Sequence, residues 1–109
     1  MAPTTVREDE VAIIVVNRVK YDASADHRPR MREIAAIAKR HGAVSMRAGR
    51  CLAGPYTGQV VSAITFPDGA GFGRALDSML ADPEYQRFVA EVVKDSELQD
   101  RWIIVAEEF

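Results

Sequence analysis

The chain of 109 residues has the length of one compact domain. Its hydrophobic content of 48% and charged content of 28% are ordinary values for a globular protein. The 14 basic and 16 acidic residues give a net charge of −2. This balance argues against a nucleic-acid partner, because nucleic-acid-binding proteins carry a basic excess or a basic stripe.

The apolar segments are short, and cysteine is rare. The longest apolar run, residues 11–16, is far too short to span a bilayer, so we expect no membrane partner. The first residues lack the basic segment and the long apolar core of a signal peptide. Cys51 is the only cysteine and can form neither an internal disulfide nor a CxxC site. Together these features predict a cytoplasmic protein.

The N-terminal part of the chain predicts a tail and a strand. Residues 1–9 are polar and show no periodicity, so we expect a flexible tail ahead of a single domain over residues 10–109. Residues 11–20 are rich in β-branched side chains, which is typical of a strand. Apolar residues occur on both faces of this strand until Asn17, which indicates that both faces are covered.

A helix is predicted after this strand. Residues 22–28 form a loop that offers Ser24 and Asp26 as helix caps, and Pro29 suits a first helical turn. An apolar stripe at helical spacing follows, formed by Met31, Ile34, Ala35 and Ala38. We expect the helix to end at Gly42, which can adopt the left-handed conformation.

Two strands joined by a tight turn are predicted next. Residues 43–53 and 59–66 have strand patterns, and the Gly-Pro-Tyr-Thr-Gly segment at 54–58 is the turn between them. Gly49 is a candidate for a bulge in the first of these strands. The second alternates, and one of its faces consists of Val60, Ser62, Ile64 and Phe66.

The last third of the chain predicts a helix in two pieces and a final strand. Asp68 is placed to cap a helix over residues 70–80, and Asp82 to cap a second piece directly after it. We expect residues 95–100 to be a polar connection and residues 101–107 to be the last strand.

The order β-α-β-β-α-β predicts a ferredoxin-like α+β fold, in which a four-stranded antiparallel sheet carries its helices on one face. The strand patterns are apolar on both faces, so the other face needs a protein cover. A second copy of the same sheet is the simplest cover, which predicts a homodimer. We expect four strand residues to be buried: Ile14, Val16, Val61 and Ile104.

The order of elements and two short segments resemble the dimeric α+β barrel superfamily. The segments are the turn at 54–58 and the Asp-Pro-Glu-Tyr helix break at 82–85, and the resemblance covers residues 10–109. The superfamily includes antibiotic-biosynthesis monooxygenases, EthD-like and NIPSNAP-like proteins, muconolactone isomerase and haem-degrading monooxygenases. The resemblance implies a pocket between the sheet and its helices, or inside the dimer barrel. It also implies a small, largely apolar ligand of aromatic or polyketide-like character.

Three polar residues on the predicted strands are candidates for this site. Asn17 is the only asparagine, and its place is similar to that of an asparagine in the haem-degrading members and some related oxygenases. That resemblance implies a hydrogen bond to a substrate carbonyl or an oxygen species; the alternative is a strand-end residue that caps a loop. Arg47 and Arg50 are candidates for binding an anionic or enolic group, or else for structural ion pairs, since an arginine within a strand needs a partner.

Three aromatic side chains and one histidine complete the candidates. Trp102, Tyr56 and Tyr85 each combine an apolar ring with a polar tip, which suits either a ligand or packing in the core or in a dimer. His27 begins a cationic segment near a predicted helix start, which either holds an anion or is a solvated loop.

No cofactor and no metal are predicted. The two histidines are not spaced as metal ligands, and no histidine lies between Gly69 and Leu98, where the haem-degrading relatives require one. Two functions stay open. One is a cofactor-independent monooxygenase or isomerase, and the other is a non-catalytic ligand-binding or stress-associated dimer. The missing histidine disfavours a third, haem binding and degradation.

Overall fold

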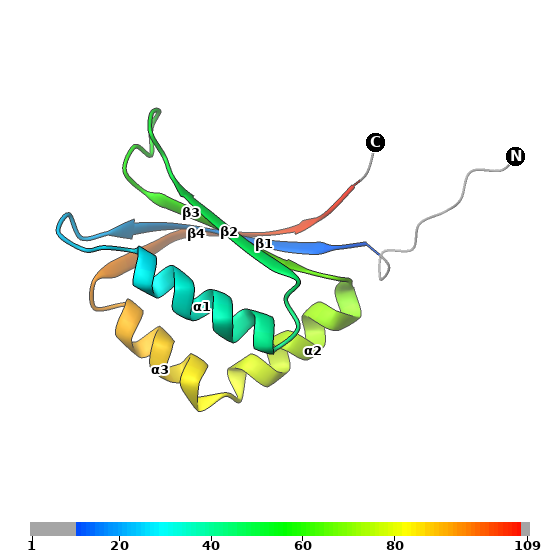
Figure 1. Ribbon diagram of the computed structural model, residues 1–109. Helices are drawn as coiled ribbons and strands as arrows, with labels where there is room; N and C mark the ends of the chain where they lie inside the picture. Colours follow the sequence, from blue (N-terminus) through cyan, green and yellow to red (C-terminus); the bar gives the residue numbers. More distant parts are fainter. Residues whose placement is uncertain (1–10, 108–109) are drawn as a thin grey trace, which may run out of the picture.

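The computed structural model describes residues 11–107 and contains a four-stranded antiparallel sheet with three helices on one of its faces (Figure 1). The expected tail at residues 1–9 lies outside the described residues. The elements are β1 (Ile13–Tyr21), α1 (Arg28–Arg40), β2 (Ser45–Arg50), β3 (Val60–Phe66), α2 (Gly69–Leu80), α3 (Pro83–Val92) and β4 (Ser96–Val105). This order confirms the predicted ferredoxin-like α+β architecture, with its second helix in two pieces.

The strands lie in the order β2-β3-β1-β4, and every neighbouring pair is antiparallel. The polar connection predicted over residues 95–100 is wrong, because β4 begins at Ser96 and pairs there with Tyr21 of β1. A register shift between Arg18 and Val19 accommodates the extra length. β4 is an edge strand, so its polar side chains stay in contact with solvent and do not oppose pairing.

The turn between β2 and β3 forms as predicted, but β2 is shorter than residues 43–53. Gly54 and Gly58 have φ angles of 99° and 87°, in the left-handed region that glycine adopts without strain. The bulge considered at Gly49 is absent from β2, because the β2–β3 register runs unbroken through the Gly49–Val61 pair. The register shift lies instead between β1 and β4, where Arg18 and Val19 pair with Asp100 and Leu98 and Gln99 of β4 is the extra residue.

Two of the predicted caps are confirmed. Asp68 accepts the backbone N–H of Gly71 at the start of α2, and Asp82 accepts that of Glu84 at the start of α3. The N-cap residue of α1 is His27, whose side chain caps nothing, so neither Ser24 nor Asp26 is the cap. The Asp26 carboxylate instead accepts the N–H of Arg28. No described helix has the length and apolar character needed to cross a membrane.

The core lies between the helices and the face of the sheet that they cover. The alternation of β3 is confirmed, since Val60, Ser62, Ile64 and Phe66 are all buried. The helices contribute Ile34, Ile37, Ala38, Ala75, Met79 and Phe88 to the core, and β1 contributes Ile13.

The free face of the sheet, on the side without helices, is apolar and uncovered. Ile14 lies opposite Thr65 on β3 and opposite Ile104 on β4, which places these side chains on the face away from Ile13. None of Ile14, Val16, Val61 and Ile104 is buried in the single chain, and Ile104 is exposed. Their predicted burial is therefore wrong for one chain, because every described helix lies on the other face (Figure 1).

We expect Ile37→Ala to be strongly destabilising. Ile37 is 0% exposed within α1, so the truncation leaves a cavity in the core. Such changes cost about 2–5 kcal/mol of the free energy of unfolding. Urea unfolding measures this, with Leu52→Ala as the control, because Leu52 is 88% exposed and its truncation costs within about 0.5 kcal/mol. Equal stabilities of the two variants would contradict the assigned core.

Candidate functional site

Asn17 lies on the helix side of β1 and is bonded to a residue of the neighbouring strand. Arg101 of β4 lies directly opposite Asn17, and its Nε donates to the Asn17 Oδ1 over 2.7 Å. Ser62 of β3 lies opposite Asn17 on the other side and is buried. Because a guanidinium can only donate, the Asn17 oxygen is the acceptor. Within the described residues neither the Asn17 NH2 group nor the terminal nitrogens of Arg101 donate a hydrogen bond, so both can donate to a ligand. The Asn17–Arg101 pair therefore presents hydrogen-bond donors.

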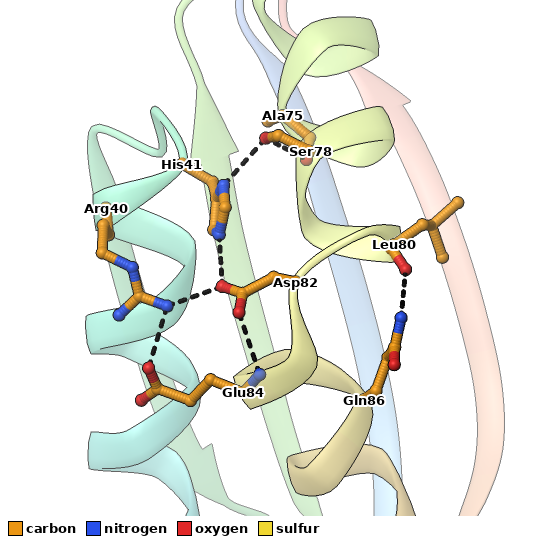
Figure 2. A network of polar contacts seen from close by, with 8 residues as sticks. All are labelled: Arg40, His41, Ala75, Ser78, Leu80, Asp82, Glu84 and Gln86. Atoms are coloured by element: carbon orange, nitrogen blue, oxygen red, sulfur yellow. Dashed lines mark hydrogen bonds and ion pairs between the residues drawn. The ribbon is translucent and has the colours of Figure 1, made fainter.

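The surroundings of this pair are apolar and open. We define the β4 strip as the helix-side residues of β4, which are Leu98, Arg101, Ile103 and Val105. All four are exposed, because α1 packs against β2 and α2 against β3, while β4 lies beyond them. In Figure 2, the Leu80 side chain points away from α1, toward the side on which part of β4 is seen. Further exposed apolar side chains of α2 and α3 are Leu76 and Val89.

A hollow lies over β2 and β3. It has a volume of about 340 Å³ and is lined by Arg47, Ala48, Gly49, Arg50, Cys51, Val61, Ser62 and Ala63. No helix residue lines this hollow, although α1 packs against the helix side of β2, so the hollow opens on the free face. We call it the Gly49 hollow, since the missing side chain of Gly49 leaves open space there.

Arg18 is held in place on the free face. Its guanidinium donates to Asp100 and to the Gln59 Oε1, and the Tyr56 ring stacks on it at 3.7 Å from the ring centroid. The Arg18 side chain is only 11% exposed. These partners satisfy the charge, so the cluster fastens the β2–β3 turn to β1 and β4.

His27 belongs to a polar cluster at the start of α1. Its ring lies 5.9 Å from that of Tyr21, and Arg30 pairs with Asp95 nearby. The Tyr21 hydroxyl and the Asp95 Oδ1 are buried without a hydrogen-bond partner in the structure. Burial, and then the Asp95 carboxylate, raise the pKa of Tyr21. A polar hollow of about 440 Å³, which Tyr21 helps to line, lies at the same end of β1.

A network of polar contacts joins the end of α1 to the junction between α2 and α3 (Figure 2). The Nε2 of His41 lies 2.7 Å from the Asp82 Oδ2, and its Nδ1 lies 2.8 Å from the Ser78 Oγ. Arg40 donates to the same Asp82 oxygen over 2.6 Å. Although the order Ser–His–Asp is that of hydrolases, the Ser78 hydroxyl donates to the carbonyl of its own helix at Ala75. The network therefore serves to fix the helices.

The predicted candidates are scattered over the molecule. Trp102 lies opposite Val16 on the free face, whereas Asn17 lies on the helix side, so the two cannot line one hollow of a single chain. Arg47 lies on the free face and Arg50 at the end of β2, and both are exposed. Tyr85 packs against the core.

Arg101 was missed by sequence reasoning. The sequence places it at the start of the last strand, where a charged residue is ordinary and does not indicate a site. Only the pairing of β4 with β1, which spans 84 positions in sequence, places it beside Asn17.

The described residues hold no group of three or more His, Cys, Asp or Glu side chains that could bind a metal ion.

Comparisons with known proteins show the family and the fold. The family model described as "Domain of unknown function (DUF6854)" matches residues 12–100. No curated protein matches the sequence.

Three solved structures illustrate the likeness of fold. SnoaB, a cofactor-independent oxygenase from Streptomyces nogalater, is 21% identical with a TM-score of 0.70, over 91% of this chain and 96% of SnoaB. A NIPSNAP family protein from Agrobacterium tumefaciens is 14% identical with a TM-score of 0.67, over 92% of each chain. A dimeric ferredoxin-like protein from an uncultured marine organism is 14% identical with a TM-score of 0.59, over 91% of this chain and 100% of its own. These likenesses confirm the predicted ferredoxin-like α+β fold.

We expect Asp82→Asn to lower stability in a pH-dependent way. Hydrogen bonds from His41 and then Arg40 hold the pKa of the Asp82 carboxyl well below its ordinary value of 3.8. A carboxyl with a lowered pKa stabilises the fold above its unfolded-state pKa, and this stability is lost as the pH falls through the folded-state pKa. The variant should therefore unfold a few degrees below the wild type at neutral pH, and the difference should shrink below pH 3.8.

Thermal unfolding followed by circular dichroism, from neutral to strongly acidic pH, measures this effect. Asp77→Asn is the matched control, because it removes an exposed carboxylate from the adjacent helix α2. A difference for Asp82→Asn that does not change with pH would contradict the role of its charge.

Proposed function

Since the chain belongs to the family described as "Domain of unknown function (DUF6854)", whose description assigns no activity, we propose a function from the geometry. The protein is a homodimer that binds a small, largely apolar molecule on the β4 strip, where Asn17 and Arg101 orient it. The observation that carries this proposal is a donor-only polar pair surrounded by exposed apolar side chains.

The chemistry of the pair indicates which part of a ligand it binds. An amide NH2 and a guanidinium both donate, so they favour a ligand oxygen with partial or full negative charge. Leu98 and Ile103 flank Arg101 on the same face and offer an apolar surface to the body of the ligand. An aromatic or polyketide-like molecule with a carbonyl, enolate or phenolate oxygen meets both requirements.

The proposed activity is that of a cofactor-independent monooxygenase. SnoaB, a cofactor-independent oxygenase with the same fold, supports this proposal. In such a reaction O2 oxidises a substrate CH2 group to a carbonyl. One oxygen atom enters the substrate, and the other leaves as water with the two hydrogens. The substrate enolate supplies the electrons, so the protein has to orient it and stabilise its charge. Asn17 and Arg101 are suited to that task.

A non-catalytic binding protein is the second candidate. Neither an amide nor a guanidinium can abstract a proton at neutral pH, so the Asn17–Arg101 pair contains no general base. Binding alone requires no base. An isomerase, which moves protons, is the activity that this pair supports least.

The free face supports the homodimer. Its apolar side chains include Ile14, Val16 and Ile104, which the helices leave uncovered. A contiguous apolar surface of this kind marks an interaction site. The dimeric ferredoxin-like neighbour has the same fold, in agreement with this use of the face.

Binding of anilinonaphthalene sulfonate, an aromatic probe with a charged oxygen group, should depend on Arg101. We expect Arg101→Gln to weaken its binding about tenfold through loss of a charge-assisted hydrogen bond, and Asn17→Ala to weaken it less. Both variants should keep nearly wild-type stability. Fluorescence titration measures the binding, and Arg47→Gln on the opposite face is the matched control.

Equal weakening by Arg47→Gln would contradict the site. Aromatic compounds that displace the probe are then tested for O2 uptake. Uptake by the wild type that is lost in Arg101→Gln supports the oxygenase, and binding without uptake supports the non-catalytic protein.

Val16→Asp should dissociate the dimer without unfolding the chain. Val16 lies at the centre of the free face, between Ala63 and Trp102, and a buried unpaired charge there is costly. Sedimentation velocity should give a dimer for the wild type and a monomer for the variant. Val44→Asp is the control, since Val44 is an exposed apolar residue ahead of β2. A wild-type monomer at every concentration would contradict the dimer.

A further inference from the structure

The free face carries a recess near one edge of the sheet. Gly49 on β2 has no neighbouring heavy atom within 4 Å of the place where a Cβ would lie. Val61 and Ala63 of β3 form the floor of the Gly49 hollow, whose volume is about 340 Å³, and Arg47 lies at its rim. The recess is therefore apolar in its centre and cationic on one side.

The same face carries a projection near the opposite edge. Trp102 on β4 lies opposite Val16, and its side chain is on the free face. It is the only tryptophan of the chain, and it is 48% exposed. Two such faces could not pack closely against each other unless each made room for the ring of the other.

The strand order makes the recess and the projection complementary under two-fold symmetry. In the order β2-β3-β1-β4, the hollow lies over the first two strands and Trp102 on the last. In an isologous contact, a residue that meets a patch of the partner is itself met in the same way. One rotation therefore brings each projection to the recess of the other chain, and both contacts form together.

Charges beside the two features are of opposite sign. Arg47 is exposed at the rim of the hollow, and the described residues offer it no ion pair. Asp100 precedes Trp102 by two positions, so it lies on the same face, and its side chain is 40% exposed. Only the Oδ2 of Asp100 takes part in the hydrogen bonds from Arg18, which leaves Oδ1 for a further donor.

We propose that the Trp102 ring of each protomer docks in the Gly49 hollow of a second copy of this chain, with Arg47 beside the docked ring. This inference rests on the dimer of the proposed function and specifies its central contact. It also assigns the Gly49 hollow to the interface, so the ligand site stays on the helix side at Asn17 and Arg101.

A double-mutant cycle tests the contact. Gly49→Leu fills the hollow, and the backbone at Gly49 does not have the positive φ that would strain a larger residue. Trp102→Ala removes the ring. Each single variant should raise the dimer dissociation constant about tenfold or more, because hot-spot aromatic contacts have this size. The double variant should dissociate no more readily than Trp102→Ala, since leucine then occupies the space that the ring has left.

Analytical ultracentrifugation gives the four dissociation constants, and circular dichroism checks that each variant is folded. Additive effects of the two substitutions would overturn the docking, because residues that do not touch contribute independently. Arg32→Ala on α1, which is exposed and lies on the helix side of the molecule, serves as a control and should leave dimerisation nearly unchanged.

The fluorescence of the single tryptophan gives a second readout in the unaltered protein. Burial of the ring in an apolar recess should shift its emission to shorter wavelength as the protein associates, and dilution should reverse the shift. Emission that stays constant while sedimentation reports dissociation would overturn the docking and leave the dimer intact. A protein that is monomeric at all concentrations would overturn the dimer itself, so the two failures are distinct.

Discussion

The helices cover only one face of the sheet, and the location of the core, the candidate site and the proposed interface all depend on this. Because side chains alternate along a strand, β1 sends Ile13 into the core and Ile14 to the free face. The described helices of this chain do not cover the apolar free face of the sheet, so another protein surface has to cover it. The same constraint leaves β4 outside the helix layer, so that its helix side is open as well.

β4 therefore contributes residues both to the proposed ligand site and to the proposed dimer interface. Its residues Trp102 to Val105 are all exposed, and they alternate between the two faces. Arg101 and Ile103 face the proposed ligand site, whereas Trp102 and Ile104 face the proposed partner. An exposed apolar edge strand is a liability in a monomer, because it invites unspecific pairing. Occupation of both faces by defined partners would cover the exposed apolar side chains of this strand.

The features that the sequence predicts well are those fixed by neighbouring residues. The caps Asp68 and Asp82 bond to N–H groups within three positions, and the glycines at 54 and 58 need only local backbone freedom. The cap of α1 is a local error, whereas the errors that affect the site and the interface concern long-range pairing. The polar start of β4 becomes a strand only because β1 lies beside it. The Asn17–Arg101 pair depends on the register between β1 and β4, which shifts at Arg18 and Val19. Burial of Ile14 and Ile104 was misjudged because the sequence does not state whether helices or a second chain cover them.

The charged residues of the free face bear on how a partner could bind there. An arginine enclosed in an apolar interface is costly unless its donors are paired, and Arg18 already has Asp100, Gln59 and the Tyr56 ring as partners within its own chain. A partner can therefore cover the Arg18 guanidinium at little further cost in desolvation free energy. Within the described residues Arg47 makes no ion pair, so a partner that covers it has to supply an acceptor or leave it in contact with water. Paired and unpaired charges on one face thus limit the orientations that a partner can adopt, because any placement that buries Arg47 alone is penalised. The orientation that sets Asp100 near Arg47 is the one that also brings Trp102 to the Gly49 hollow.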